Sequence, residues 1–294
     1  MKEMDNNLSD EIRMWQEKLF KRSIRRTRKL ARMEELVGSA ANLQCLEISS
    51  GDGTVSEHLR SLGGSWKTAV STQNAADSIG HSISEAITLI DQAQLPFEDQ
   101  AFDMLVVVDA LKGIASDRDF VRECHRVLKT DGWVVISEEC RRPASLVALL
   151  RKLLGVSPLS AGQQRNGYTL HELYAILKDG FDVPKTILYS NGLFEAVAAL
   201  GEFAQKLITR GPCWMVPEKA GQHELYGYRK LHSLSGIAHP LLWLLSKFEF
   251  LPGHKLIVKS RRRPWRARTQ PKLVDGRSIA EAAINTKIGT AAPF

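Results

Sequence analysis

The chain contains 294 residues, of which 44% are apolar, and it carries a formal net charge of +7 at pH 7. An apolar fraction of this size excludes disorder throughout the chain and suffices for one substantial hydrophobic core. The four cysteines, at positions 45, 124, 140 and 213, have neither the close pairing of a zinc site nor the density of a disulfide framework. We therefore expect a folded cytoplasmic protein without a metal site, a secretory signal or a membrane-spanning helix.

The positive charge is concentrated at the two ends of the chain. Residues 1–33 have a net charge of +5 and residues 259–294 one of +7, whereas residues 34–258 have one of −5. The acidic body argues against a nucleic-acid cleft, so a nucleic-acid partner is not expected. The basic termini suit contact with an anionic membrane surface. We divide the chain into a basic amphipathic N-terminal helix at 1–38, a domain at 39–260 and a basic flexible tail at 261–294.

A basic amphipathic helix is predicted over residues 8–37. Leu8, Ile12, Trp15 and Leu19 recur at helical spacing, and lysines and arginines crowd the remaining positions. Two interpretations stay open. The helix either adsorbs to anionic lipid, where each basic residue near the surface contributes about 1 kcal/mol, or packs its apolar stripe on the domain. RNA binding is a third alternative.

Residues 43–62 predict a strand, a turn of small residues and a helix. Gly51 and Gly53 lack a Cβ atom, so the turn lets a ligand approach the backbone closely. A capping box over residues 54–57 would begin the helix beside the same ligand, which suits a nucleotide-like molecule. NAD and FAD are disfavoured, because Ser56 stands where a dinucleotide fingerprint has its third glycine.

From Leu43 onward, short apolar runs alternate with helical patterns. This order predicts a doubly wound, mostly parallel, seven-stranded α/β sheet with helices on both faces. Ligands in such sheets bind beyond the carboxyl ends of the strands, so the site is expected in the turns that follow them. The predicted strands are 43–48, 66–71, 87–90, 103–109, 133–137, 185–189 and 255–259, with helical inserts at 141–167 and 193–254.

Three segments together resemble the class I S-adenosylmethionine-dependent methyltransferases, in particular their small-molecule, type 11-like branch. Residues 43–54 resemble the family's motif I, with Ser49 in place of its first glycine. Residues 89–109 resemble its adenine strand, Leu-Pro-Phe turn and fourth strand, and residues 123–136 its helix leading into the fifth strand. The resemblance implies a Rossmann-like methyltransferase fold and S-adenosyl-L-methionine as the cofactor.

The resemblance also implies which residues of the first strand and turn hold the cofactor. Glu47 matches the acid of motif I, and Ser49 stands at the first glycine position. Gly51 and Gly53 match the last two glycines, which cradle the methionine end of the cofactor in the family.

The nucleoside end of the cofactor would meet the next two turns. Asp91 and Gln92 match the family's adenine-binding pair, although an aspartate at this place also initiates turns. The second strand lacks the usual ribose-binding acid, and Thr72 stands near its end instead. A hydroxyl makes one hydrogen bond where a carboxylate makes two charge-assisted ones.

Substrate-side residues are expected after the fourth and fifth strands. Asp109 ends the fourth strand, where family members place polar residues near the substrate, and capping of the next helix is the alternative. Tyr168 and His171 lie in the insert that covers the substrate in related enzymes, so we assign them to a lid. A capping box at 169–172 is the alternative explanation of that sequence.

An apolar helix is predicted around residues 240–251. It is too short to span a bilayer. It could rest in a lipid interface, form the wall of an apolar pocket or pack on the sheet. In the tail, the arginines around Pro264 and Trp265 argue against a packed core. The candidates for the lining of an acceptor site are Leu146, Leu149, Leu153, Trp243 and Phe248.

The sequence thus predicts a methyltransferase that transfers a methyl group in line to a small hydrophobic or lipid-linked acceptor, at the inner membrane surface. Such an enzyme would be cytoplasmic and peripheral at the membrane. The first alternative is a binding or regulatory protein that keeps the fold without catalysis, because Ser49 and the absent ribose acid depart from the family pattern. RNA methylation is the second alternative, and the acidic body disfavours it.

Overall fold

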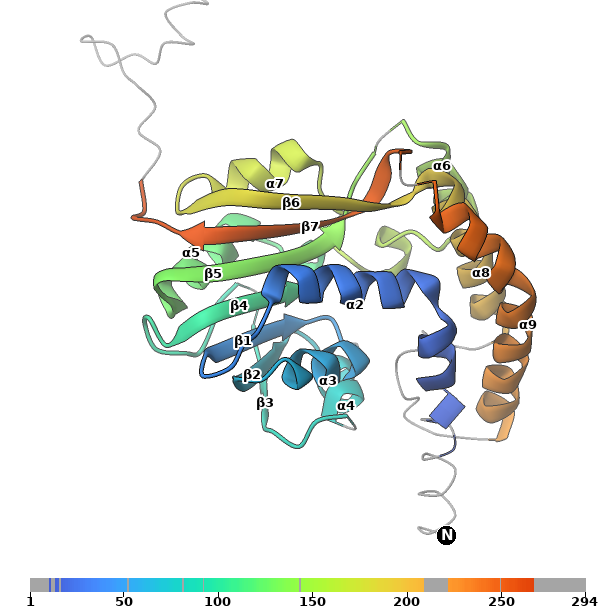
Figure 1. The fold of residues 1–294 in the computed structure, drawn as a ribbon, viewed down its shortest axis with the longest axis horizontal. Coiled ribbons are helices and arrows are strands. Elements are labelled where there is room, and N and C mark those ends of the chain that lie inside the picture. Colours follow the sequence, from blue (N-terminus) through green and yellow to red (C-terminus); the bar gives the residue numbers. More distant parts are fainter. Residues whose placement is uncertain are drawn as a thin grey trace, which may run out of the picture.

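One seven-stranded sheet forms the centre of the protein (Figure 1). The structure, a computed structural model, describes residues 11–266 apart from residues 12, 13, 16, 52, 81, 92, 143, 209–221 and 249. The strands are β1 (Gln44–Ser49), β2 (Ser65–Val70), β3 (Ile87–Leu89), β4 (Phe102–Val108), β5 (Leu128–Glu139), β6 (Phe181–Asn191) and β7 (Gly253–Arg262). Their order is β3-β2-β1-β4-β5-β7-β6, with β1 to β5 parallel and β7 antiparallel to both neighbours.

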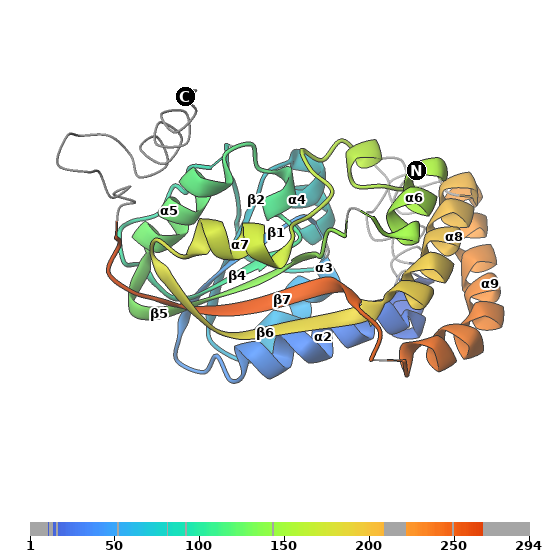
Figure 2. The same cartoon turned by 90° about the horizontal axis from the view of Figure 1, so that it is seen from above.

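Helices surround this sheet, and some of them cover its two faces. They are α2 (Ile24–Val37), α3 (Gly53–Ser61), α4 (Gln73–Gly80), α5 (Asp117–Val127), α6 (Leu146–Leu153), α7 (Leu170–Leu177), α8 (Gly192–Ile208) and α9 (Gln222–Ser246), with short 3-10 turns η1 (Leu111–Gly113) and η2 (Leu159–Ala161). Helices α2 and α3 pack on one face, and α5 and α7 on the other (Figure 2). The predicted doubly wound α/β fold is confirmed.

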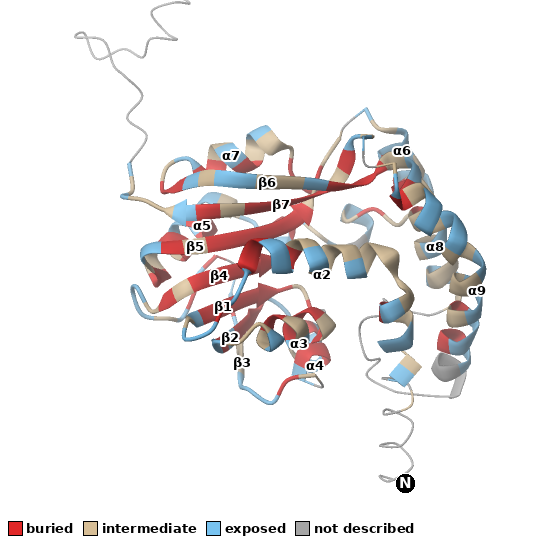
Figure 3. Cartoon of the chain, in the orientation of Figure 1, coloured by how far each residue is buried: buried red, intermediate tan, exposed pale blue. Residues whose placement is uncertain are grey.

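The core forms because the central strands are apolar on both sides. Along β4, Met104, Val106 and Val108 contribute to the cluster under α2 and α3, while Leu105 and Val107 contribute to the cluster under α5 and α7. A strand that is covered on both faces has to be apolar at nearly every position, and Figure 3 shows these strands as buried. All seven predicted strands are present, and β5 begins five residues before its predicted start.

The strand register places the expected binding turns along one edge of the sheet. Ser49 of β1 is level with Val70 of β2 and with Val108 of β4. Val70 is in turn level with Leu89 of β3, and Val108 with Ser137 of β5. The turns after β1 to β5 therefore follow one another along the carboxyl edge. Helices α6, α8 and α9 stand beyond this edge (Figures 1 and 2).

The N-terminal helix differs from its prediction in continuity and in orientation. Ser23 interrupts it, and α2 follows. Met33, Leu36 and Val37 of α2 are buried against the sheet, so the packing interpretation applies to this part of the predicted helix. Its basic residues Arg25 and Lys29 form ion pairs with acidic residues of the domain. Residues 8 and 12 lie outside the described residues.

Two C-terminal predictions need correction. Helix α9 begins at Gln222, well before the predicted start near residue 240, and continues through Pro240. Residues 261–266, which we placed in a flexible tail, belong to the domain: β7 runs to Arg262, and the ring of Trp265 packs edge-on against His125 with centroids 5.1 Å apart. The backbone N–H of Arg263 donates to the carbonyl oxygen of Gly180 at 2.9 Å. Residues 267–294 lie outside the described part of the chain.

Candidate functional site

The turn after β1 has the conformation that a close backbone approach requires. Gly51 has φ +113°, which L-residues rarely adopt. The buried Ser49 hydroxyl accepts a hydrogen bond from the Gly51 N–H at 3.4 Å. A Cβ atom on Gly53 would lie 2.5 Å from the Ser82 hydroxyl oxygen, so this position also needs glycine. Helix α3 begins at Gly53, so Thr54 lies inside the helix and the capping box predicted at 54–57 is not its start.

Glu47 lies beneath this turn rather than on its surface. Its side chain is fully buried. Oε1 accepts a hydrogen bond from the Ser56 hydroxyl at 2.6 Å, and Oε2 accepts one from Arg60 Nη1 at 3.0 Å. Burial raises the pKa of Glu47, and the bonds from Ser56 and Arg60 partly oppose that rise. The carboxylate thus joins β1 to α3 and holds the turn in place, a role that differs from the predicted direct contact with the cofactor.

The turns after β2 and β3 contain the residues that were expected to bind the nucleoside end of the cofactor. The Thr72 hydroxyl accepts from the Ala75 N–H at 3.3 Å, which places it at the start of α4. Asp91 is exposed, and its carboxylate makes no hydrogen bond to any residue that the structure describes. Gln92 lies outside the described residues. The glycine turn and the free carboxylate of Asp91 therefore fit a nucleoside ligand that lies along this edge of the sheet.

Asp109 forms an ion pair with a residue of the N-terminal helix. It has φ +52°, and its Oδ2 accepts a hydrogen bond from Lys29 Nζ at 2.5 Å. Burial opposes ionisation, but Lys29 and Lys112 outweigh it and hold the pKa of Asp109 well below its usual range. Asp109 does not cap the next helical turn, where Ala110 is the N-cap residue. It is therefore ionised and paired, and it is a poor proton acceptor.

Glu138, at the end of β5, is a second carboxyl group of this edge. The N–H of Lys112 donates to Glu138 Oε1 at 3.3 Å, and Lys112 Nζ lies 3.7 Å from Oε2. Oε2 has no hydrogen-bond partner among the described residues. Burial raises the pKa of Glu138 to about 6, which suits a group that exchanges a proton near neutral pH. The sequence did contain a signal for Glu138, since this residue directly follows the strand predicted at 133–137, in one of the turns where the site was expected.

A larger ion-pair network lies on the side of β5 that faces α6. Glu139 accepts from Lys255 Nζ and from Arg151 Nη1, each at 2.8 Å. Arg151 Nη2 also donates to the buried Glu195 at 2.7 Å. Arg25 of α2 lies 3.3 Å from the same Glu195 oxygen. The network fastens α2, α6 and α8 to the ends of β5 and β7, and no local sequence pattern predicted it.

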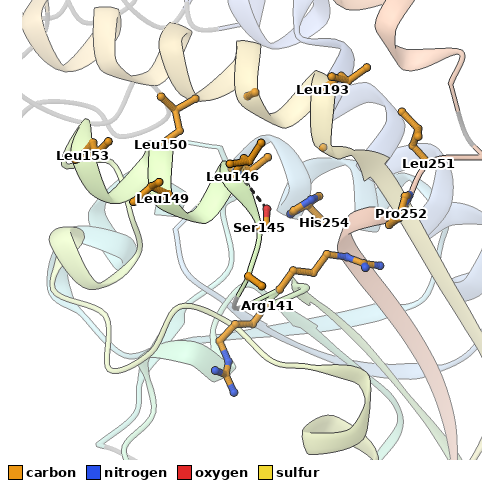
Figure 4. Close-up of a pocket in the computed structure, with 15 residues that line it drawn as sticks. Arg141, Ser145, Leu146, Leu149, Leu150, Leu153, Leu193, Leu251, Pro252 and His254 are labelled. Atoms are coloured by element: carbon orange, nitrogen blue, oxygen red, sulfur yellow. Dashed lines mark hydrogen bonds between the residues drawn. The ribbon is translucent and has the colours of Figure 1, made fainter.

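Two hollows adjoin α6. The first has a volume of about 950 Å³ and a mostly apolar lining, which also includes Arg141, Arg142 and His254. Figure 4 shows His254 beside Leu146 and Ser145. The second has a volume of about 800 Å³ and includes Glu139 and Arg151 of the ion-pair network. We call the first hollow the α6 groove. The apolar side chains of its wall include Leu146, Leu149, Leu150, Leu153, Leu193 and Leu251.

The predicted acceptor-lining residues divide into two groups. Leu146, Leu149 and Leu153 lie together in the lining of the α6 groove. Trp243 and Phe248 do not line it: Trp243 is 53% exposed on α9, and the Phe248 ring packs near Phe250 with centroids 5.8 Å apart.

The two predicted lid residues have different environments. Tyr168 is buried, and its hydroxyl donates to the carbonyl oxygen of Leu111 at 3.2 Å. Burial raises the pKa of this phenol further above its ordinary value. Tyr168 is thus an internal support of η1 rather than a lid. His171 is exposed in the first turn of α7, outside both hollows. The capping box at 169–172 is confirmed.

Comparison with known sequences identifies related proteins. Residues 46–136 match the model of a protein family described as "Methyltransferase domain". A stretch of 61 residues is 39% identical to ribosomal RNA-processing protein 8 of Mus musculus, covering 21% of this chain and 13% of that protein. A stretch of 213 residues is 24% identical to a sterol 4-C-methyltransferase of Caenorhabditis elegans, covering 70% of this chain and 54% of that protein. The chain thus spans about half of one relative and far less of the other.

Comparison with solved structures shows the same fold in enzymes of different kinds. The [4+2]-cyclase SpnF matches with a TM-score of 0.52 at 16% identity, over 80% of this chain and 79% of that one. Geranyl diphosphate C-methyltransferase from Streptomyces coelicolor A3(2), solved with Mg²⁺, geranyl diphosphate and S-adenosyl-L-homocysteine, matches with a TM-score of 0.51 at 13% identity, over 81% and 78%. At such identities the likeness concerns the fold alone.

Proposed function

We propose that the chain, whose residues 46–136 match the model of a methyltransferase domain, transfers a methyl group from S-adenosyl-L-methionine to a small, hydrophobic or lipid-like acceptor. The observation that carries the proposal is the turn after β1. Gly51, at φ +113°, opens the backbone at the carboxyl edge of the sheet, directly before the N-terminus of α3.

The residues that would hold the cofactor lie along this edge. The backbone of residues 49–53 would receive its methionine end, and the free Asp91 carboxylate would accept the amino group of its adenine. Thr72, between them on the edge, offers one hydroxyl near the ribose. The bound cofactor supplies an activated methyl group on a sulfonium, so the protein has mainly to align the acceptor.

The α6 groove supports an apolar acceptor. Its wall is formed mainly by leucines, and two arginines and a histidine also line it and could contact a polar group of the acceptor. Two similar proteins are named for action on a sterol and on geranyl diphosphate, and each of these molecules has a large apolar hydrocarbon part. We assign Glu138, rather than Asp109, to accept a proton from an acceptor that must lose one, because Glu138 Oε2 has no hydrogen-bond partner among the described residues and burial raises the pKa of this carboxyl group to about 6. Glu138 lines neither hollow, so it would act on a part of the acceptor that reaches the carboxyl edge of the sheet.

Incubation with methyl-labelled S-adenosyl-L-methionine and a membrane lipid extract tests this proposal. We expect label in the organic phase. Gly51→Ala should reduce it strongly, since alanine is strained at φ +113°. Gly201→Ala is the matched control, because a Cβ atom on this glycine of α8 meets nothing within 4 Å. Label in added RNA instead would favour RNA methylation, which the short match to an RNA-processing protein keeps as a second candidate.

A further inference from the structure

Three helices at the carboxyl edge expose rows of large apolar side chains. On α6, Leu146 is 83% and Leu153 is 76% exposed. On α8, Leu193, Leu200 and Leu207 recur every seven residues and are 53%, 52% and 71% exposed. Soluble proteins rarely leave several adjoining apolar rows uncovered, and such rows mark interaction sites. The exposed large apolar residues of α9 and the turn after it are Tyr226, Leu234, Ile237, Leu241, Trp243, Leu244 and Phe250.

The rows of α6 and α8 meet at the α6 groove, and α9 packs against α8. Leu146, Leu153 and Leu193 are both highly exposed and part of the groove wall, so the rows of α6 and α8 meet there. The segment after α9 reaches the same wall through Leu251 and Pro252. We call the exposed residues of α6, α8 and α9 the apolar face. Its position means that the groove opens onto it.

Among the described residues, the free charges of the apolar face are positive; Glu249, between Lys247 and Phe250 in the sequence, lies outside them. Lys152 of α6, Lys206 of α8 and Lys247, directly after α9, are exposed. Helix α6 contains no acidic residue, and α9 contains none from Tyr226 to Ser246. The two acids of α8 are engaged: Glu195 is buried, and Glu202 forms salt bridges with Arg25 and Arg151. A protein partner of average composition would offer no match for such a one-sided pattern, whereas anionic lipid does.

Trp243 and Lys247 form a pair typical of a membrane interface. The ammonium group of Lys247 lies 4.8 Å from the centre of the Trp243 ring, and both side chains are exposed. An indole seats well at the headgroup level, and a lysine stem can follow it while the ammonium group stays in water. Phe250, 81% exposed, extends the same end of α9. Among the described residues, no helix is long and apolar enough to cross a bilayer.

We propose that the apolar face docks on an anionic phospholipid membrane, with α6, α8 and α9 lying in its interface and the α6 groove open to the lipid. This inference rests on the proposed function, because it states where the lipid-like acceptor is taken from. It places the contact on these helices instead of on the N-terminal helix, whose Arg25 and Lys29 are engaged inside the protein. An acceptor could then enter the groove without passing through water.

Sedimentation with vesicles tests the docking. We expect the full chain to sediment with vesicles of phosphatidylcholine and phosphatidylserine, and less with phosphatidylcholine alone. High salt should weaken this binding without abolishing it, since apolar burial is insensitive to screening. The triple variant Leu200→Glu, Leu207→Glu, Trp243→Glu should bind at least about tenfold more weakly. None of these three residues lines the groove.

Leu188→Glu is the matched control, because Leu188 is an exposed leucine, 38% accessible, on β6 outside the apolar face. It should bind as the unaltered chain does. Unchanged binding of the triple variant, or no binding of the unaltered chain, would overturn the proposal. The proposal would also be overturned if light scattering showed the unaltered chain to be a dimer and the triple variant a monomer, while neither bound vesicles. The assay contains no cofactor, so methyl transfer to a detergent-dispersed acceptor reports separately on the proposed function.

Discussion

At the scale of single residues, neighbours decide the protonation of the two carboxyl groups beside the site. Asp109 and Glu138 end adjacent strands, and the Asp109 N–H donates to the carbonyl oxygen of Ser137 at 2.9 Å. Lysines lower the pKa of Asp109, while burial raises that of Glu138 to about 6. The two neighbouring acids thus have different roles: Asp109 is a fixed negative charge, and Glu138 is a proton acceptor.

Replacement of Lys29 tests the fixed charge. We expect Lys29→Met to lower the free energy of unfolding by about 2 kcal/mol at neutral pH, because it leaves Asp109 without its hydrogen-bond donor. The pKa of Asp109 is lowered in the folded state. The ionised Asp109 therefore stabilises the folded protein above pH 3.8, its ordinary pKa, and this stabilisation is lost as the pH falls below that value. The deficit should therefore shrink in acid. Urea unfolding with the exposed Lys21→Met as control measures this, and a deficit that persists in acid would contradict it.

Glu138→Gln tests the proton acceptor. We expect kcat for an acceptor that must lose a proton to fall by about 100-fold, with little change in KM. In the unaltered enzyme, kcat should rise with pH through about 6 as the carboxyl group ionises, and the variant should lose this rise. The contribution of Glu138 to stability has the opposite dependence on pH. Because the pKa of Glu138 is raised in the folded state, this contribution is complete below pH 4.5, its ordinary pKa, and is lost as the pH rises through about 6. The exposed Glu57→Gln is the control, and an unchanged pH profile in Glu138→Gln would exclude this role.

At the scale of elements, α2 and the end of β7 belong to the domain because of side chains far from them in sequence. Helix α2 is held by its buried Met33 and Leu36 and by the Lys29 contact to Asp109. The end of β7 is held by Trp265, whose ring fills the space beside Gly180 and His125. A basic composition alone would have assigned both segments to solvent.

Trp265→Ala tests the end of β7. The indole is half-buried, so its loss should cost about 2 kcal/mol of unfolding free energy, less than the cost at a fully buried site. Arg261→Ala, an exposed neighbour on β7, should cost under about 0.5 kcal/mol. Thermal or urea unfolding of both variants gives the comparison. Equal and small losses of unfolding free energy in the two variants would mean that the flexible tail begins at residue 261, as the sequence predicted.

At the scale of the whole molecule, the sequence predicted the sheet well and the charged site poorly. The strands could be found because burial on both faces demands an apolar run, as in Met104 to Val108. The glycine turn was found because its conformation needs Gly51. The ion-pair partner of Asp109 could not be predicted from the sequence. Lys29 lies 80 residues earlier, in a helix with many basic residues, and no local pattern distinguishes it from the others. The apolar face was equally hidden, since exposure is decided by how α6, α8 and α9 pack.

The measurement that tests the account most directly is calorimetric titration of the unaltered chain with S-adenosyl-L-methionine. The turn after β1 and the exposed carboxylate of Asp91 predict one bound cofactor per chain, with a dissociation constant below about 1 mM, the upper end of usual KM values. Binding that is millimolar or weaker would contradict the account. The chain would then keep the architecture of a methyltransferase domain and act by binding alone.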